Sequence, residues 1–185
     1  LSQLRIIPAG RPPHRAQPCS SAEDRLAMAR LALAGASHLV LDDHEVRAEL
    51  PSYTVPTLER LRGELDAARP LVLVLGVDAF LGLPSWHRWQ AIFGLAHVAV
   101  ATRPGYTLKA AEMDVRLQEE FAARVCASSA LAAQGAHGAI THFTMTPLAI
   151  SATAIRALLA RGESPRFLLP DAVLDYIHHH HLYEN

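Results

Sequence analysis

Short apolar runs with β-branched residues recur along the chain, and longer segments with helical spacing separate them. The runs occupy residues 4–7, 38–41, 71–75, 97–101 and 139–145. Such short runs, bounded by turn residues, indicate strands. Because parallel strands need crossover connections, the alternation of strands and helices predicts an α/β fold with a parallel sheet and helices on both faces.

The segments between these runs carry helix signals. Ser20 and Glu23 have the spacing of a capping box ahead of an alanine- and leucine-rich stretch. A second helix is expected after Thr54, with one apolar face formed by Leu58, Leu61 and Leu65. A third is expected to start near Ser85, and residues 109–134 form either a helix or a mobile connection.

Composition narrows the class of protein. The 185 residues, half of them hydrophobic, fit a single domain over residues 1–185. With 17 basic and 18 acidic residues, no strong overall field attracts nucleic acid or a membrane, so an anion site must be built locally. Cys19 and Cys126 form neither a disulfide framework nor a zinc pattern, which fits a cytoplasmic protein. Nothing in the sequence indicates an oligomeric state.

The segment ISATAIR, residues 150–156, is the strongest candidate for an anion site. Apolar residues at helical spacing follow it and Gly162 is placed to end the helix, so Ser151 and Thr153 should lie near the helix amino end. Free N–H groups there, the two hydroxyls and the fork of Arg156 suit a polyphosphate. The alternative is that a hydroxyl only caps the helix and Arg156 pairs with an acid.

Ligands of parallel sheets bind beyond the carboxyl ends of the strands, and the loops expected there hold further candidates. Gly76 suits close approach of the backbone to a ligand, and Asp78 suits accepting from ribose hydroxyls or helping to hold a metal. The alternative is only a tight turn with an aspartate cap. Trp86 and Trp89 offer a flat face to an aromatic ring or pack in the core. Three further residues could bind an anion or be solvated surface residues: His14, Arg15 and Arg103.

Seven blocks in order, IIPAGRPPHR, PSYT, LVLVLGVDAF, LPSWHRW, TRPGY, ISATAIR and LLPDAVLDYI, resemble the bacterial nicotinate mononucleotide adenylyltransferase family over nearly the whole chain. The resemblance implies a Rossmann-like nucleotidyltransferase that joins the AMP part of ATP to nicotinate mononucleotide and releases pyrophosphate, with Mg²⁺ accompanying ATP. Its implied ATP-binding residues are Gly76, Asp78, Ile150, Ser151, Thr153 and Arg156. Its implied mononucleotide-binding residues are His14, Arg15, Tyr53, Thr54, Trp86, His87 and Arg103. No residue is expected to ligate a metal on its own.

The sequence departs from the family pattern at two places. Ala9 stands where many members carry asparagine. The family also opens with a strand and a GxFxPxHxGH loop, whose histidines stabilise charge on the reacting phosphates, and no residue of this sequence is assigned that catalytic role. We therefore expect the natural protein to have an additional strand, loop and helix before Leu1, about 20 to 30 residues long.

Two other functions remain open from the sequence. One is a sister adenylyltransferase that acts on another phosphorylated acceptor, such as phosphopantetheine. The other is a nucleotide-binding module without catalytic activity. The PSYT and SWHRW blocks favour the nicotinate enzyme over the sister enzyme.

Overall fold

The computed structural model describes residues 3–12, 19–146 and 148–184. Clustering of contacts divides the chain into two compact units. The terminal unit consists of Leu1–Ser52 and Ala149–Asn185, and the central unit of Tyr53–Leu148. The assignment of residues 1–185 to a single domain stays a prediction. Among the described residues, no helix has the length and apolar character needed to cross a membrane.

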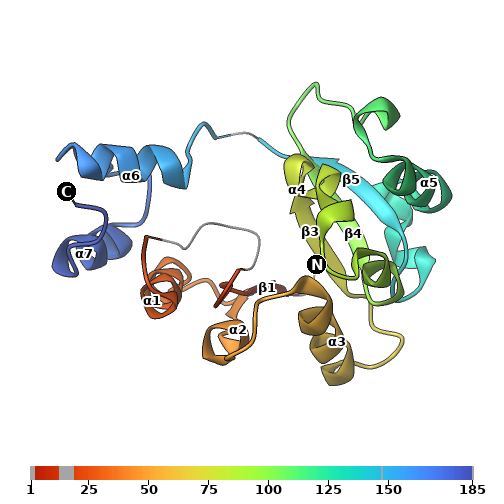
Figure 1. Cartoon of the computed structure of the whole chain (residues 1–185), viewed down its shortest axis with the longest axis horizontal. Coiled ribbons are helices and arrows are strands. Elements are labelled where there is room, and N and C mark those ends of the chain that lie inside the picture. The colour runs from red at the N-terminus through yellow and green to blue at the C-terminus, as the bar shows by residue number, and fades with distance from the viewer. Residues whose placement is uncertain (1–2, 13–18, 147, 185) are drawn as a thin grey trace. The chain divides into compact units, whose positions relative to one another are not determined.

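The central unit is built on three parallel strands in the order β3-β4-β5 (Figure 1). Their bounds are Val72–Gly76 for β3, His97–Thr102 for β4 and Ile140–Thr144 for β5. The register aligns Gly76 with Ala101 and Thr102 with Thr144. The carboxyl ends of all three strands therefore meet at one edge of this sheet.

One face of this sheet forms the main core. Leu75, Val98, Val100 and Ile140 pack there against α3 (Thr54–Glu64), α4 (Val77–Leu81) and α5 (Val115–Arg124). Four short 3₁₀ segments join these elements: η1 (Leu83–Ser85), η2 (Trp89–Gly94), η3 (Ala110–Glu112) and η4 (Ser128–Gln134). Burial of this apolar face stabilises the unit and fixes where the loops leave β3 and β4.

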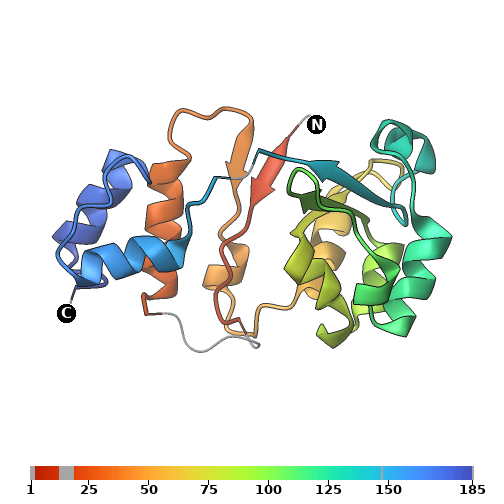
Figure 2. The same cartoon turned by 90° about the horizontal axis from the view of Figure 1, so that it is seen from above.

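The terminal unit holds the other two parallel strands, β1 (Leu4–Ile6) and β2 (Leu39–Leu41). Its helices are α1 (Ala22–Ala32), α2 (His44–Arg47), α6 (Ala152–Ala160) and α7 (Asp171–His179). Figures 1 and 2 both show α1, α6 and α7 together, and Leu159, Val173, Leu174 and Ile177 form their shared core. The α/β class and the parallel pairing of all five expected strands are confirmed.

The ends of α6 are also where the sequence predicts them. Ser151 is the N-cap, and Gly162 adopts a left-handed φ of 71° just beyond the helix. The Glu163 N–H donates to the Leu158 carbonyl at 3.0 Å, as in a glycine-terminated helix end. The cap at Ser151 fixes where α6 begins and therefore where its free N–H groups lie.

Three local expectations are wrong in detail. The capping box of α1 is formed by Ser21 and Asp24, one residue later than expected. Leu65 lies just past α3, in extended backbone, so it leaves the shared face. No α-helix starts near Ser85, because Arg88 takes a left-handed φ of 55° and only the 3₁₀ segment η2 follows.

Candidate functional site

The amino end of α6 combines a helix cap with unused donors. Ser151 Oγ accepts a hydrogen bond from the Ala154 N–H at 3.1 Å, so the capping alternative is realised for this residue. A hydroxyl that accepts through a lone pair still has its hydrogen to donate. The N–H groups of Ala152 and Thr153 lie in the first turn, where the helix carries partial positive charge. Capping by Ser151 is thus compatible with binding an anion.

Arg156 lies half-buried one turn further along α6. Its Nε donates to the Ala152 carbonyl at 3.1 Å, and its guanidinium carbon lies 5.9 Å from the centroid of the Tyr183 ring. Within residues 3–12, 19–146 and 148–184, no carboxylate forms a salt bridge with it. The expected alternative of an acid pair is therefore not found among these residues. Thr153 and Ile150 are exposed, Ile150 at 41%.

Gly76 is the last residue of β3 and the N-cap of α4 in the central unit. Its φ of −74° is open to any residue, and a Cβ built on it meets nothing within 4 Å. In the described structure, neither the backbone conformation nor the packing requires glycine at this position. The space beside Gly76 is open. Asp78 stands exposed in the first turn of α4, without a side-chain cap bond at that helix end.

Arg103 leaves the carboxyl end of β4, beside the end of β3 that carries Gly76. Its side chain is exposed, and its carbonyl accepts from the Tyr106 N–H at 3.1 Å in a turn through Gly105, whose φ is 79°. The Tyr106 hydroxyl donates to Glu112, which raises the pKa of Tyr106; burial and the nearby carboxylate of Asp78 act in the same direction.

Tyr53 and His87 are brought together from the PSYT and SWHRW blocks. Their ring centroids lie 4.7 Å apart at an interplanar angle of 39°. Thr54 is the first residue of α3 and is half-buried, so its N–H belongs to the positive end of that helix. Pro56 in the first turn has no N–H and therefore leaves no orphan donor there.

The loop around His87 is held in an uncommon backbone conformation. Arg88 adopts φ 55° and its guanidinium donates to Glu59 of α3 at 2.8 Å, so the loop is tied to the helix that begins at Thr54. Trp86 is partly buried and packs against the main core, whereas Trp89 is only 6% exposed and meets Phe93 edge-on. Trp89 therefore belongs to the core, and Trp86 lies at its margin with part of its surface exposed.

His14 and Arg15 lie outside the described residues. The backbone that leads toward them is firmly held in the terminal unit. Gly10 donates its N–H to Ser52 Oγ at 2.9 Å, and Arg25 donates to the carbonyls of Ala9 and Gly10. A Cβ on Gly10 would lie 2.0 Å from the Glu45 carbonyl oxygen, so this close approach requires glycine.

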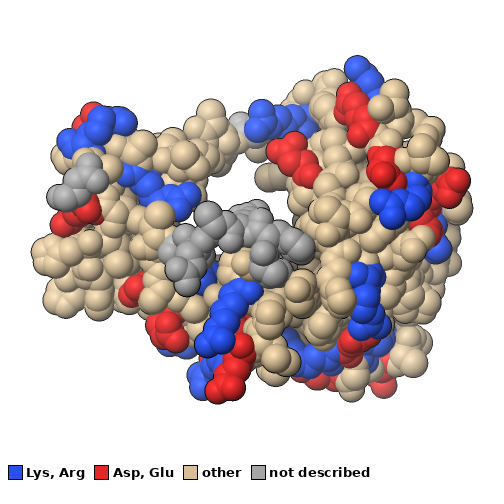
Figure 3. Space-filling model, viewed as in Figure 1, with Lys and Arg blue, Asp and Glu red and all other residues tan. Residues whose placement is uncertain are grey.

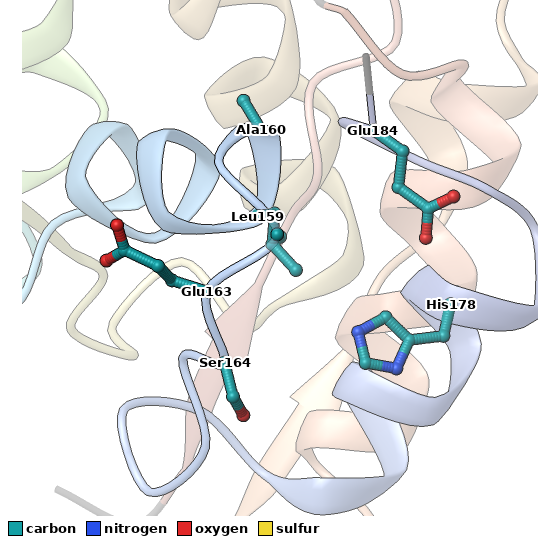
Figure 4. Close-up of a pocket in the computed structure, with 7 residues that line it drawn as sticks. Leu159, Ala160, Glu163, Ser164, His178 and Glu184 are labelled. Carbon is teal, nitrogen blue, oxygen red and sulfur yellow. The ribbon is translucent and has the colours of Figure 1, made fainter.

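Two hollows in the structure contain none of the predicted site residues. The first, about 300 Å³, lies at the carboxyl end of α6; in Figure 4 the His178 ring turns toward it while the carboxylate of Glu163 points away from that ring. Glu163 pairs instead with Arg161 at 2.7 Å. The second, about 470 Å³, includes Arg124 and His137 near the amino ends of β4 and β5. Within its own unit, the first lies away from the first turn of α6, and the second lies away from the strand ends that carry Gly76 and Arg103.

Charge is mixed over the face seen in Figure 3, where basic and acidic side chains alternate on the central unit. Pairs such as Arg60 with Glu64 and Arg124 with Glu120 account for part of this pattern. In the described part of the chain, no group of three or more histidine, cysteine, aspartate or glutamate residues could hold a metal ion.

Comparison with known proteins decides the family. Residues 2–158 match the family described as "Cytidylyltransferase-like". The chain is 54% identical to the "Probable nicotinate-nucleotide adenylyltransferase" of Dechloromonas aromatica, over 100% of this chain and 85% of that protein. It is 51% identical to the protein of the same name from Pseudomonas fluorescens, over 99% of this chain and 84% of that protein. The chain belongs to the nicotinate-nucleotide adenylyltransferase family.

A solved structure extends the similarity to the fold of this family. It is the Plasmodium falciparum nicotinic acid mononucleotide adenylyltransferase complexed with NaAD, which aligns with a TM-score of 0.69. The alignment covers 99% of this chain and 83% of that one at 14% identity. The nucleotidyltransferase fold expected from the seven blocks is confirmed.

Sequence reasoning did not find Arg25, Ser52 and Arg88, whose roles depend on contacts between distant segments.

Proposed function

We propose that this protein transfers the adenylyl group of ATP to nicotinate mononucleotide, giving nicotinate adenine dinucleotide and pyrophosphate in NAD biosynthesis. The single observation that carries the proposal from the geometry is the first turn of α6. There the N–H groups of Ala152 and Thr153 and the half-buried Arg156 lie together without a carboxylate partner for Arg156 among the described residues. In a member of this family, that arrangement suits the phosphates of ATP.

Two groups of residues are assigned to ATP. Ser151, Thr153 and Arg156, with Ile150 beside them, bind the phosphate chain, since hydroxyls, helix N–H groups and a guanidinium all donate to anionic oxygens. Gly76 and Asp78 lie beside the adenosine. Support for this comes from the open space at Gly76, which its backbone conformation does not require, and from the exposed carboxylate of Asp78, which can accept from ribose hydroxyls.

The mononucleotide site is assigned to the first residues of α3 and the loop around His87. Thr54 and the backbone near His87 receive the nicotinate carboxylate, and Trp86 stacks on the pyridine ring, with Tyr53 against His87 forming a wall. Arg103, His14 and Arg15 are the further residues assigned to the mononucleotide. A carboxylate pairs with backbone donors, whereas an amide NH₂ would leave them unsatisfied, so the acid is preferred over nicotinamide mononucleotide.

The reaction is an in-line displacement at the α-phosphorus of ATP. A phosphate oxygen of the mononucleotide forms the new bond to that phosphorus while the bond to the oxygen bridging to the β-phosphate breaks, and pyrophosphate leaves with the electron pair. Positioning and charge neutralisation supply the catalysis, and no protein nucleophile is needed. Mg²⁺ bound to ATP would neutralise charge on the leaving pyrophosphate, and Asp78 is the carboxylate of the assigned site that could meet it.

We also propose that the protein works in the cytoplasm. The two free thiols, Cys19 and Cys126, fit a reducing compartment.

An acceptor screen with the complete natural protein tests the function. ATP and Mg²⁺ are supplied with nicotinate mononucleotide, nicotinamide mononucleotide or phosphopantetheine, and pyrophosphate release is measured. We expect rapid release with nicotinate mononucleotide and much slower release with the other two. Release with phosphopantetheine alone would identify the sister enzyme, and ATP binding without release would identify a non-catalytic module.

A further inference from the structure

The orientation of Arg156 depends on few contacts. Its Nε donates to a carbonyl of its own helix, that of Ala152, and its guanidinium lies over the Tyr183 ring at 5.9 Å. The described part of the chain gives it no carboxylate. An acidic partner would neutralise the guanidinium and occupy its donors, whereas an aromatic face attracts the cation and leaves the terminal N–H groups for another acceptor.

Tyr183 is itself held in place from two directions. Its hydroxyl donates to Ser20 Oγ at 2.8 Å, and Ser20 is 9% exposed just ahead of α1. Its ring packs beside the core shared by α6 and α7, which includes Leu159 and Ile177. The Tyr183 ring therefore keeps its position as long as α1, α6 and α7 remain packed together.

The backbone around Tyr183 is strained to reach this position. Tyr183 has φ 65° and His181 has φ 51°, and bulky side chains rarely adopt this left-handed region. The Leu182 N–H donates to the Ile177 carbonyl at 3.0 Å, which turns the segment back at the end of α7. Such strain persists only where surrounding contacts determine it, and here the contacts are those of the Tyr183 ring and hydroxyl.

We propose that Tyr183 is a positioning residue for ATP, acting through Arg156. Its ring restricts the guanidinium to an orientation in which the terminal nitrogens remain available to phosphate, and the Ser20 bond fixes the ring. The proposal rests on the assignment of Arg156 to the ATP phosphates. A purely structural role would instead make Tyr183 matter for stability alone.

ATP affinity without acceptor separates this inference from the transfer reaction. The dissociation constant for ATP is measured by calorimetry with the complete natural protein and its Tyr183→Leu, Tyr183→Phe and Ser20→Ala variants. We expect an increase of about tenfold for Tyr183→Leu, which loses the aromatic face. Tyr183→Phe and Ser20→Ala keep the face and lose one hydrogen bond, so we expect about a two- to threefold increase for each.

A double-mutant cycle decides whether Tyr183 acts through Arg156. Arg156→Ala should weaken ATP binding by about thirtyfold, and adding Tyr183→Leu should weaken it no further. Tyr176→Phe, which loses the 2.9 Å bond to Asp24 between α7 and α1, is the matched control and should leave ATP affinity unchanged. Additive effects of the two substitutions would overturn the proposal.

Two further outcomes bear on it. An unchanged ATP affinity in a folded Tyr183→Leu variant would also overturn it. If Tyr183→Leu does not fold, the cycle is run with Ser20→Ala, and an effect that disappears in the Arg156→Ala background supports the proposal, whereas an effect that persists contradicts it. If only the acceptor screen fails, the transfer reaction is rejected. The role of Tyr183 is then decided by the ATP affinities, which do not depend on the acceptor.

Discussion

Ser151 Oγ accepts from the Ala154 N–H at 3.1 Å, the same geometry in which Ser21 Oγ accepts from the Asp24 N–H at 3.0 Å. Both serines cap a helix through this bond, and Ser21 adds a capping box with Asp24, yet only Ser151 belongs to the assigned ATP site. The pair therefore separates what a cap contributes to stability from what a hydroxyl contributes to binding.

Replacing Ser151 by alanine should affect both properties. We expect a loss of about 1 kcal/mol in the free energy of unfolding, as for other N-cap serines, together with a severalfold rise in KM for ATP. Ser21→Ala is the matched control, with a larger loss of stability, because Ser21 Oγ also donates to Asp24 at 2.6 Å, and an unchanged KM. Equal KM values in the two variants would reduce Ser151 to a helix cap. Denaturant unfolding and steady-state kinetics supply the two measurements.

Trp86 and Trp89 should respond differently to truncation. Trp86→Ala removes a partly buried ring at the margin of the core, so we expect mainly a higher KM for nicotinate mononucleotide, equivalent to about 1 to 3 kcal/mol of stacking. Trp89→Ala empties a core position that is 6% exposed and should cost about 3 to 5 kcal/mol of stability. If Trp86→Ala is largely unfolded but its folded fraction binds the mononucleotide with normal affinity, Trp86 is a core residue like Trp89.

Gly76→Ala tests whether the open space beside β3 belongs to a ligand. The φ of −74° and the absence of described atoms within 4 Å predict a change in stability within about 1 kcal/mol. If adenosine approaches this backbone, KM for ATP should rise clearly. Gly10→Ala is the opposite case, because its Cβ would clash with the Glu45 carbonyl and cost about 1 to 3 kcal/mol. Normal ATP kinetics in Gly76→Ala would remove the glycine from the site.

The link between α1 and α7 should weaken in acid. The Ser21 hydroxyl, at 2.6 Å, is the main cause that holds the pKa of Asp24 below its usual 3.8, and the Tyr176 hydroxyl adds to it against the opposing effect of burial. A depressed pKa contributes stability that is present above 3.8 and lost as pH falls through the lower folded value. Wild type should therefore have a higher Tm than Asp24→Asn at pH 7, and the gap should close below pH 3.8. A gap that stays constant with pH would contradict this.

Much of the fold follows from local sequence patterns. The apolar runs at residues 72–76 and 97–102 are strands, and Leu75, Val98 and Val100 from these runs are buried in the core. Ser151 and Gly162 fix the ends of α6 through one cap bond and one left-handed residue. Chemistry contained within a few residues could therefore be predicted without the structure.

Other features depend on contacts between distant segments. Both Ser20–Glu23 and Ser21–Asp24 have capping-box spacing, and only the three-dimensional structure selects the second. Arg88 adopts a left-handed conformation while it pairs with Glu59, and this ends the helix expected near Ser85. The Tyr183 contact with Arg156 needs a strained turn after α7, for which the sequence has no glycine signal.

Labelled ATP gives the most direct test of the central claim. The complete natural protein is incubated with nicotinate mononucleotide, Mg²⁺ and ATP labelled on either the α- or the γ-phosphate, and the products are separated and identified by mass. The account predicts that the α-label appears in nicotinate adenine dinucleotide and the γ-label in pyrophosphate. An α-label that stays in a nucleotide without nicotinate, or a γ-label released as single phosphate, would contradict adenylyl transfer to this acceptor.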